Sequence, residues 1–194
     1  MNNRFSFVAF LMGVWLVVFA SCDNPPSGGG TVSQPIDRVV MEFTDSNGQV
    51  TTGEAIDPDG DGPAEIEGVT PIILSRDESY TLSIRLFNQD SGDEQTSTIE
   101  FQGVSHQFFF QWSSGLFADP AGNGNVDNPQ DPVNYLDEDR NGLPIGLRTG
   151  WDTGSSASGS FRVILKYQPS IKSEDSGALN GETQGILSFT ISVL

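Results

Sequence analysis

Two acidic segments have the spacing of oxygen ligands for a hard cation. The first reads D-P-D-G-D-G at residues 57–62, and the second reads D-E-D-R-N-G at residues 137–142. Carboxylate or amide oxygens at alternate positions, followed by a glycine that lets the chain turn sharply, suit Ca²⁺. Carboxylates this close also repel one another, so a bound cation would stabilise them. We therefore predict Ca²⁺ ligands at Asp57, Asp59, Asp61, Asp137, Asp139 and Asn141.

Neither segment is an EF-hand, because that motif needs a bidentate glutamate at its twelfth position. Counted from Asp57, this position is Gly68, and counted from Asp137, it is Arg148. The alternative interpretation is a pair of solvated turns in which Asp and Asn side chains bond their own backbone. Both interpretations stay open at the level of sequence.

The only histidine of the chain begins the aromatic segment H-Q-F-F-F-Q-W at residues 106–112. In a strand, His106 and Trp112 share one face. His106 is either a hydrogen-bonded residue at the rim of the core, or a ligand for a small molecule or transition metal together with a carboxylate such as Glu100. Trp112 and Trp151 border glycine-rich loops, where an indole ring can stack on a flat ligand or plug the end of the fold. We favour the plug.

The first 21 residues have the pattern of a secretion signal. Arg4 precedes an apolar run over residues 5–19, which is shorter than the roughly 20 residues of a membrane span. Ala20 and Ser21 then lead to Cys22, the only cysteine. This arrangement resembles the lipobox of bacterial lipoproteins, which implies lipidation of Cys22; an ordinary secretion signal before an incidental cysteine is the alternative. The Pro-, Gly- and Ser-rich residues 22–35 predict a flexible tether to the membrane.

Charge and missing motifs narrow the function. The chain carries 26 Asp and Glu residues against 9 Lys and Arg residues, a net charge of −17, which disfavours nucleic acid as a partner. The sequence has neither a G-x-S-x-G nor an H-E-x-x-H motif. A hydrolase that uses two carboxylates stays open, although no pair stands out. We predict that the protein is not an enzyme.

Alternating hydrophobicity predicts that residues 36–194 form one all-β domain. Period-two patterns, typical of half-buried strands, cover residues 39–44, 80–86, 161–167 and 187–193. Clusters of Gly, Asn and Asp between them suit turns, and no stretch of ten or more residues shows helical periodicity. We expect an antiparallel two-sheet sandwich, immunoglobulin-like in the broad sense, with about seven to nine strands. The predicted organisation is therefore a signal at 1–21, a lipidated tether at 22–35 and a β-sandwich at 36–194.

Four segments in one order resemble a known family. They are D-P-D-G-D-G at residues 57–62, H-Q-F-F-F at 106–110, D-x-D-x-N-G-x-P-x-G-L at 137–147 and F-R-V-I-L-K-Y-Q-P at 161–169. Together they are similar to small acidic lipoproteins of Bacteroidota whose genes often neighbour those of TonB-dependent outer-membrane receptors. The resemblance implies a location at the outer membrane and an accessory role in the uptake of a nutrient or metal complex. It implies no catalytic residues.

The leading hypothesis is a lipid-anchored, non-catalytic binding module at either face of the outer membrane. Its expected partners are the membrane, through the lipid on Cys22, an outer-membrane receptor protein, and a small ligand or metal complex. The alternative is a structural or adhesive surface module stabilised by Ca²⁺. Adhesive modules commonly occur in tandem, and this chain shows no internal repeat, which favours the binding module.

Overall fold

The computed structural model describes residues 36–57, 65–89 and 91–194. Cys22, Asp59 and Asp61 lie outside these ranges, so the predictions made for them are not addressed by the structure. The described elements, in chain order, are β1 (Arg38–Asp45), β2 (Val50–Ile56), β3 (Glu65–Glu67), β4 (Ile72–Leu74), β5 (Ser79–Phe87), α1 (Thr96–Phe101), the 3-10 helix η1 (Gly103–Ser105), β6 (His106–Trp112), β7 (Phe117–Asp119), β8 (Asn134–Tyr135), β9 (Arg148–Thr153), β10 (Ala157–Tyr167) and β11 (Glu182–Val193).

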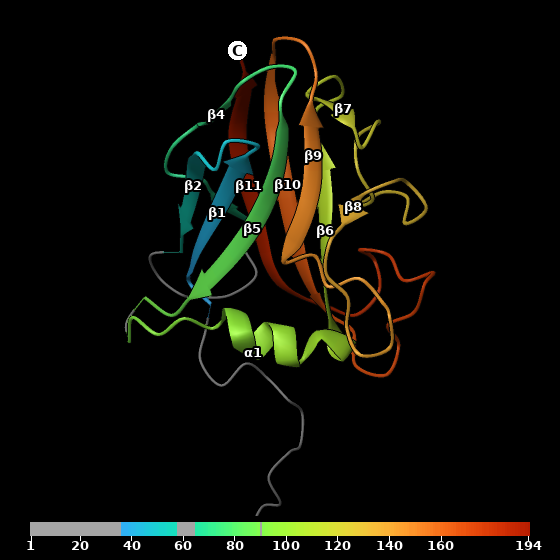
Figure 1. Ribbon diagram of the computed structural model, residues 1–194. Helices are drawn as coiled ribbons and strands as arrows, with labels where there is room; N and C mark the ends of the chain where they lie inside the picture. Colours follow the sequence, from blue (N-terminus) through green and yellow to red (C-terminus); the bar gives the residue numbers. More distant parts are fainter. Residues whose placement is uncertain (1–35, 58–64, 90) are drawn as a thin grey trace, which may run out of the picture. The chain divides into compact units, whose positions relative to one another are not determined.

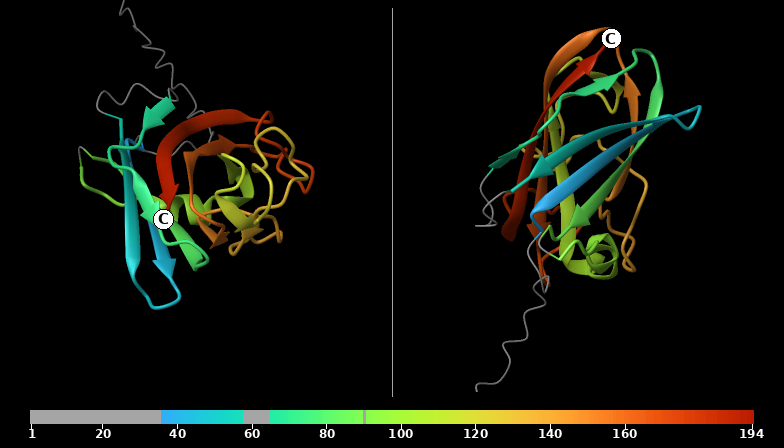
Figure 2. Two further views of the ribbon diagram at one scale, coloured as in Figure 1. Left: turned by 90° about the horizontal axis from the view of Figure 1, so that it is seen from above. Right: turned by 90° about the vertical axis from the view of Figure 1, so that its left-hand side faces the viewer.

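These strands form two sheets that pack face to face, as Figure 1 and Figure 2 show. The first sheet has the order β2-β1-β5-β9-β7, with β8 also paired to β9. The second sheet has the order β3-β11-β10-β6, with β4 also paired to β11. The all-β, two-sheet sandwich predicted from the sequence is therefore confirmed.

The alternating segments of the sequence are the long strands, and their apolar rows form the core. In β1, Met41 and Phe43 are completely buried, and in β5 the same holds for Leu82. The inward rows of β10 and β11 face them from the second sheet, where Phe161 and Ile191 are also completely buried. Burial of these rows on one face of each sheet explains why the period of two was readable in the sequence.

The sandwich departs from the predicted pattern in its short elements. The described residues contain eleven strands rather than seven to nine, and four of them are only two or three residues long. β3 and β4 pair with β11 in parallel, so the sheets are not purely antiparallel. Segments this short carry no readable alternation, and a parallel pairing depends on contacts distant in sequence. No helix in the described part of the chain is both long and apolar enough to span a bilayer.

The free edge of the second sheet, strand β6, is closed by irregular segments. The N–H of Phe108 donates to the carbonyl of Ile145 at 2.7 Å. The N–H of Phe110 donates to the side-chain oxygen of Asn125 at 3.0 Å, and the N–H of Asn125 donates back to the Phe110 carbonyl at 2.9 Å. These bonds satisfy backbone groups that would otherwise offer a template for another strand. The edge of β6 is therefore not open to pairing with a strand of another protein.

Candidate functional site

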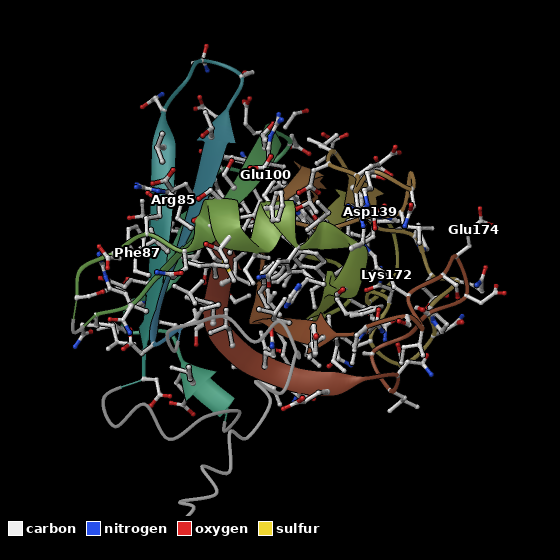
Figure 3. The ribbon with its side chains drawn as sticks, turned by 90° about the horizontal axis from the view of Figure 1, so that it is seen from below. Arg85, Phe87, Glu100, Asp139, Lys172 and Glu174 are labelled. Carbon is white, nitrogen blue, oxygen red and sulfur yellow. The ribbon has the colours of Figure 1, made fainter. Side chains whose placement is uncertain are left out.

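Three irregular segments meet at the end of the sandwich that α1 covers, which we call the helical end. α1 and η1 lie between the two sheets there (Figure 3), and Lys172 joins them to the turn of residues 137–147. Its ammonium donates to the carbonyl oxygen of Gly103 at 2.7 Å and to the Asp139 carboxylate at 2.9 Å. Both side chains of this ion pair are 1% exposed. The loop of residues 168–181 is thereby fixed to the helical segment.

The second acidic segment forms a turn in which both carboxylates accept hydrogen bonds from the protein. Asp137 accepts from the N–H groups of Gly146 at 2.8 Å, Leu147 at 2.9 Å and Arg148 at 3.2 Å. Asp139 accepts from the N–H of Asn141 at 2.8 Å and from Lys172. These bonds are the backbone-bonded turn that the sequence offered as the alternative to a calcium loop.

Two glycines explain the spacing of this turn. Gly142 has a φ of +77° and Gly146 a φ of +91°, a region that residues with a side chain rarely adopt. A Cβ atom on Gly146 would also lie 2.9 Å from the Cβ of Phe108, which is too close. The pattern N-G-x-P-x-G therefore serves the local backbone and the packing against β6.

The two carboxylates of the turn have opposite pKa shifts. Burial raises the pKa of Asp137 above its usual range, and the backbone hydrogen bonds offset only part of this rise. Burial alone would also raise the pKa of Asp139, but the hydrogen bonds from Lys172 and the backbone outweigh it and hold the pKa below its usual range. Asp139 is therefore anionic at neutral pH and neutralises Lys172.

Two hollows adjoin α1 and share one residue, Glu100. The first hollow has a volume of about 270 Å³ and is lined by Ser83, Ile84, Arg85, Glu94, Thr96, Glu100, Asp137, Leu147 and Arg148. The second has a volume of about 280 Å³ and is lined by Glu100, Phe101, Gly103, Val104, Glu138, Asp139 and Arg140. Both volumes lie just below the range of about 300–1,000 Å³ that is typical of sites for drug-sized ligands. Phe101, which is 87% exposed, lines the second hollow.

The charges of the first hollow differ in whether they are already paired. Arg85 donates to Glu94 at 3.1 and 2.8 Å and to Glu42 at 3.4 Å, and both glutamates raise the pKa of Arg85. The Arg148 guanidinium and the Glu100 carboxylate, in contrast, make no hydrogen bond or close ion pair within the described ranges, although the charge of Arg148 is near enough to offset part of the rise that burial causes in the pKa of Asp137. The hollow thus presents one cation and one anion whose hydrogen-bonding groups are not used by the protein.

His106 and Glu100, which the sequence offered as a joint site, have different surroundings. His106 has no exposed surface; its Nδ1 atom lies 3.0 Å from the carbonyl oxygen of Gln102 and its ring centroid 5.0 Å from that of Tyr167. Burial lowers its pKa. Glu100 is exposed on α1. The contact of Nδ1 fits the interpretation of His106 as a hydrogen-bonded core residue, whereas its Nε2 atom is buried without a hydrogen-bond partner among the described residues. The joint site with Glu100 stays a prediction.

The two tryptophans offered as ligand contacts belong to the core. Trp112 and Trp151 are each 2% exposed, and their ring centroids are 5.0 Å apart in an edge-to-face arrangement. With three further buried rings they form what we call the aromatic cluster: Phe110, Trp112, Phe117, Trp151 and Phe161. The burial of both rings fits the favoured plug better than stacking on a ligand.

Within the described residues, no three or more His, Cys, Asp or Glu side chains gather in a way that could hold a metal ion. Asp57, the one described carboxylate of the first acidic segment, follows β2 directly. Its proposed partners Asp59 and Asp61 lie outside the described ranges. The Ca²⁺ prediction stays a prediction.

The sequence reasoning missed Arg85, Arg140, Arg148 and Phe101, which line the two hollows. The sequence did contain one signal for these residues. Arginines are rare in this acidic chain, yet Arg140 lies within the 137–147 turn and Arg148 directly follows it. Nothing in the local pattern shows that residues 85, 100 and 148 meet. Comparison of the chain with protein-family models, with curated proteins and with solved structures finds no match.

Proposed function

We propose that this protein is a lipid-anchored, non-catalytic binding module of the outer membrane, accessory to TonB-dependent uptake of a nutrient or metal complex. The observation that carries the binding surface is the pair of hollows that share Glu100 at the helical end. Loops and short helices supported by a rigid sheet are common positions for binding residues. The lipid anchor and the receptor rest on the sequence pattern at Cys22 and on the family resemblance.

The point where the tether joins the domain supports the helical end as the binding surface. Arg38, at the start of β1, pairs with Phe87, at the end of β5, and α1 follows that strand. The chain therefore enters the sandwich at the helical end. If residues 23–35 form the flexible tether that the sequence predicts, a linker of this length would span on the order of 20 Å. Under this proposal, anchoring at Cys22 keeps the two hollows close to the membrane and to a receptor embedded in it.

Site-specific crosslinking tests the proposal. A photo-crosslinking amino acid is placed at position 101, where Phe101 is 87% exposed beside the second hollow, and in a matched control at position 73, where Ile73 is 54% exposed on β4. After irradiation of intact cells, we expect position 101 to capture an outer-membrane receptor and position 73 to capture none. Equal capture from both positions, or no capture from cells grown under several nutrient limitations, would reject the helical end as the binding surface.

The anchor is tested separately. Mass spectrometry of the mature protein should find Cys22 as its acylated N-terminus, and Cys22→Ser should remain unprocessed and leave the outer-membrane fraction. A Cys22→Ser variant that matures and localises unchanged would contradict the anchor.

We also propose Ca²⁺ at the first acidic segment, as a stabilising ion and not as a catalyst. Ligand binding to the folded state raises the melting temperature by mass action. Millimolar Ca²⁺ should therefore raise the melting temperature, Mg²⁺ should do so less, and Asp59→Ala should remove the effect. A melting curve that does not respond to Ca²⁺ would exclude the site.

A further inference from the structure

The unpaired charges of the first hollow come from different elements of the fold. Arg148 begins β9 and Glu100 lies in the last turn of α1, and both residues are exposed. Arg85, on the same hollow, is already held by two glutamates. A ligand that enters the hollow therefore finds one guanidinium and one carboxylate whose hydrogen-bonding atoms are not used by the described residues.

The arginine is held in position by the backbone around it. The Asp137 carboxylate accepts the N–H groups of Leu147 and Arg148 at 2.9 and 3.2 Å, and the N–H of Ile84 donates to the Leu147 carbonyl at 2.9 Å. Ile84 and Leu147 are themselves 1% and 5% exposed. The start of β9 is thus fixed before a ligand arrives, which lowers the entropy lost on binding.

The lining of the hollow favours one chemical class of ligand. An Arg guanidinium matches a carboxylate in a two-point hydrogen-bonded geometry, and a carboxylate such as Glu100 matches an ammonium group. The remaining residues are largely apolar, hydroxyl-bearing or already paired, so a ligand with no net charge suits the hollow. None of the residues that line it in the described structure is aromatic, which disfavours a sugar held by stacking. Glu94, Glu100 and Asp137 disfavour a polyanion such as a phosphate ester.

We propose that the first hollow binds a short zwitterionic peptide, with its carboxylate on Arg148 and its ammonium on Glu100. This inference deepens the proposed function and rests on it, because it names the class of nutrient that the module would capture. Peptide backbone between the two charged ends lies over Ile84 and Leu147 and within reach of the Ser83 hydroxyl. The volume of about 270 Å³ suits a peptide of two or three small residues.

Calorimetric titration of the full chain in detergent with triglycine tests the proposal. The same titration is repeated with N-acetyl-triglycine, which lacks the ammonium, and with triglycine amide, which lacks the carboxylate. We expect triglycine to bind and each blocked peptide to bind about tenfold more weakly, the loss typical of one charged hydrogen-bonded contact. Higher salt should weaken the binding of triglycine, since both contacts are partly exposed.

Two variants assign the contacts to residues. Arg148→Gln should bind triglycine and its amide equally, while it still discriminates against the acetylated peptide. Glu100→Gln should show the reverse. The matched controls are Arg76→Gln, in the turn between β4 and β5, and Glu174→Gln, which is exposed and lies away from α1 (Figure 3). Neither control should change any of the three affinities.

Three results would overturn the proposal: no heat of binding with triglycine up to concentrations on the order of 10 mM, equal affinity for the free and blocked peptides, or a loss with the control variants as large as with Arg148→Gln. If one of these results is found while position 101 still captures a receptor, the peptide assignment fails and the binding module stands. If capture fails as well, both proposals fall.

Discussion

The aromatic cluster and the helical end belong to one sandwich but are built from opposite chemistry. In the cluster, Trp151 lies between 4.6 and 5.7 Å, centroid to centroid, from four neighbouring rings, and all five rings are buried. At the helical end, the Lys172–Asp139 pair is buried, and Asp139 lines the second hollow together with the exposed Glu100. The rings of the cluster pack on one another, with the indole N–H of Trp151 bonded to Thr149 and that of Trp112 buried without a partner among the described residues. The helical end, in contrast, exposes Arg148 and Glu100 to solvent.

This difference separates the part of the molecule that stabilises from the part that can recognise. Aromatic packing contributes through buried area and ring geometry and offers no free group to a ligand. Exposed charges without a partner add almost nothing to the stability of the fold. Sites that do not serve the fold are where function is expected.

The largest effect should come from the aromatic cluster. Trp151→Ala removes a ring that is 2% exposed and leaves a cavity among four others, so we expect unfolding free energy to fall by about 3–5 kcal/mol. Urea denaturation followed by circular dichroism measures this loss. Trp151→Phe is the control and should lose less than half as much. A loss below about 1 kcal/mol for Trp151→Ala would show that the cluster is not the main support of the sandwich.

The next largest loss of stability is expected at the Lys172–Asp139 ion pair, through which the helical end supports the fold. Lys172→Met leaves the Asp139 carboxylate buried without its counter-charge, which we expect to cost about 3 kcal/mol. The double variant Lys172→Met with Asp139→Asn removes both charges and should recover part of the loss. Equilibrium unfolding of the three variants gives the coupling energy. Equal stability of the single and double variants would show that the ion pair does not fix the loop of residues 168–181.

The sequence predicted the long strands better than it predicted the helical end. Alternation identified β1, β5 and β11 because burial of one sheet face imposes a period of two, whereas β6 is buried on both faces. Alternation did not reveal the Lys172–Asp139 pair, whose members are 33 residues apart in the sequence. Nor did it reveal that Glu100 and Arg148 line one hollow. These contacts depend on how three loops are placed by the two sheets, and no local pattern encodes that placement.

The same reasoning explains why the sequence left two interpretations open for several candidate site residues. Tryptophans beside glycine-rich loops fit both a ligand platform and a plug, and only the packing of Trp151 against its neighbours distinguishes the two. D-x-D-x-N-G likewise fits a calcium loop and a backbone-bonded turn, because both need oxygen acceptors and a glycine. At Asp137 and Asp139, the observed acceptors are used by N–H groups and by Lys172.

A smaller change in unfolding free energy is expected from pH, through the buried His106. Burial lowers the pKa of His106 in the folded state, so the unfolded chain binds its proton more readily. Stability should therefore decrease as pH falls below the unfolded value of about 6.5, by at most about 1.4 kcal/mol for each unit that separates the two pKa values. Urea denaturation from pH 7.5 to 5 measures the decrease.

His106→Gln serves as the control for the pH experiment, because it removes the titrating ring. This variant should lose most of the dependence between pH 7.5 and 5. Asp137 acts in the opposite sense and at lower pH, since its raised pKa favours the protonated folded state. A pH dependence that is unchanged in His106→Gln would assign the decrease to other groups.

The smallest change in stability is expected from the two variants that should weaken ligand binding most. Arg148 and Glu100 have no close ion pair in the described structure, so Glu100→Gln removes no salt bridge and Arg148→Gln removes only the longer-range attraction to Asp137. Each should change unfolding free energy by less than about 0.5 kcal/mol, while each removes one contact to triglycine. Arg85→Gln is the informative comparison, because it breaks the contacts to Glu94 and Glu42 and should cost up to about 1 kcal/mol. If Arg148→Gln instead destabilised the protein as much as Arg85→Gln, its guanidinium would have a structural partner, and the charge that we assign to a ligand would belong to the fold.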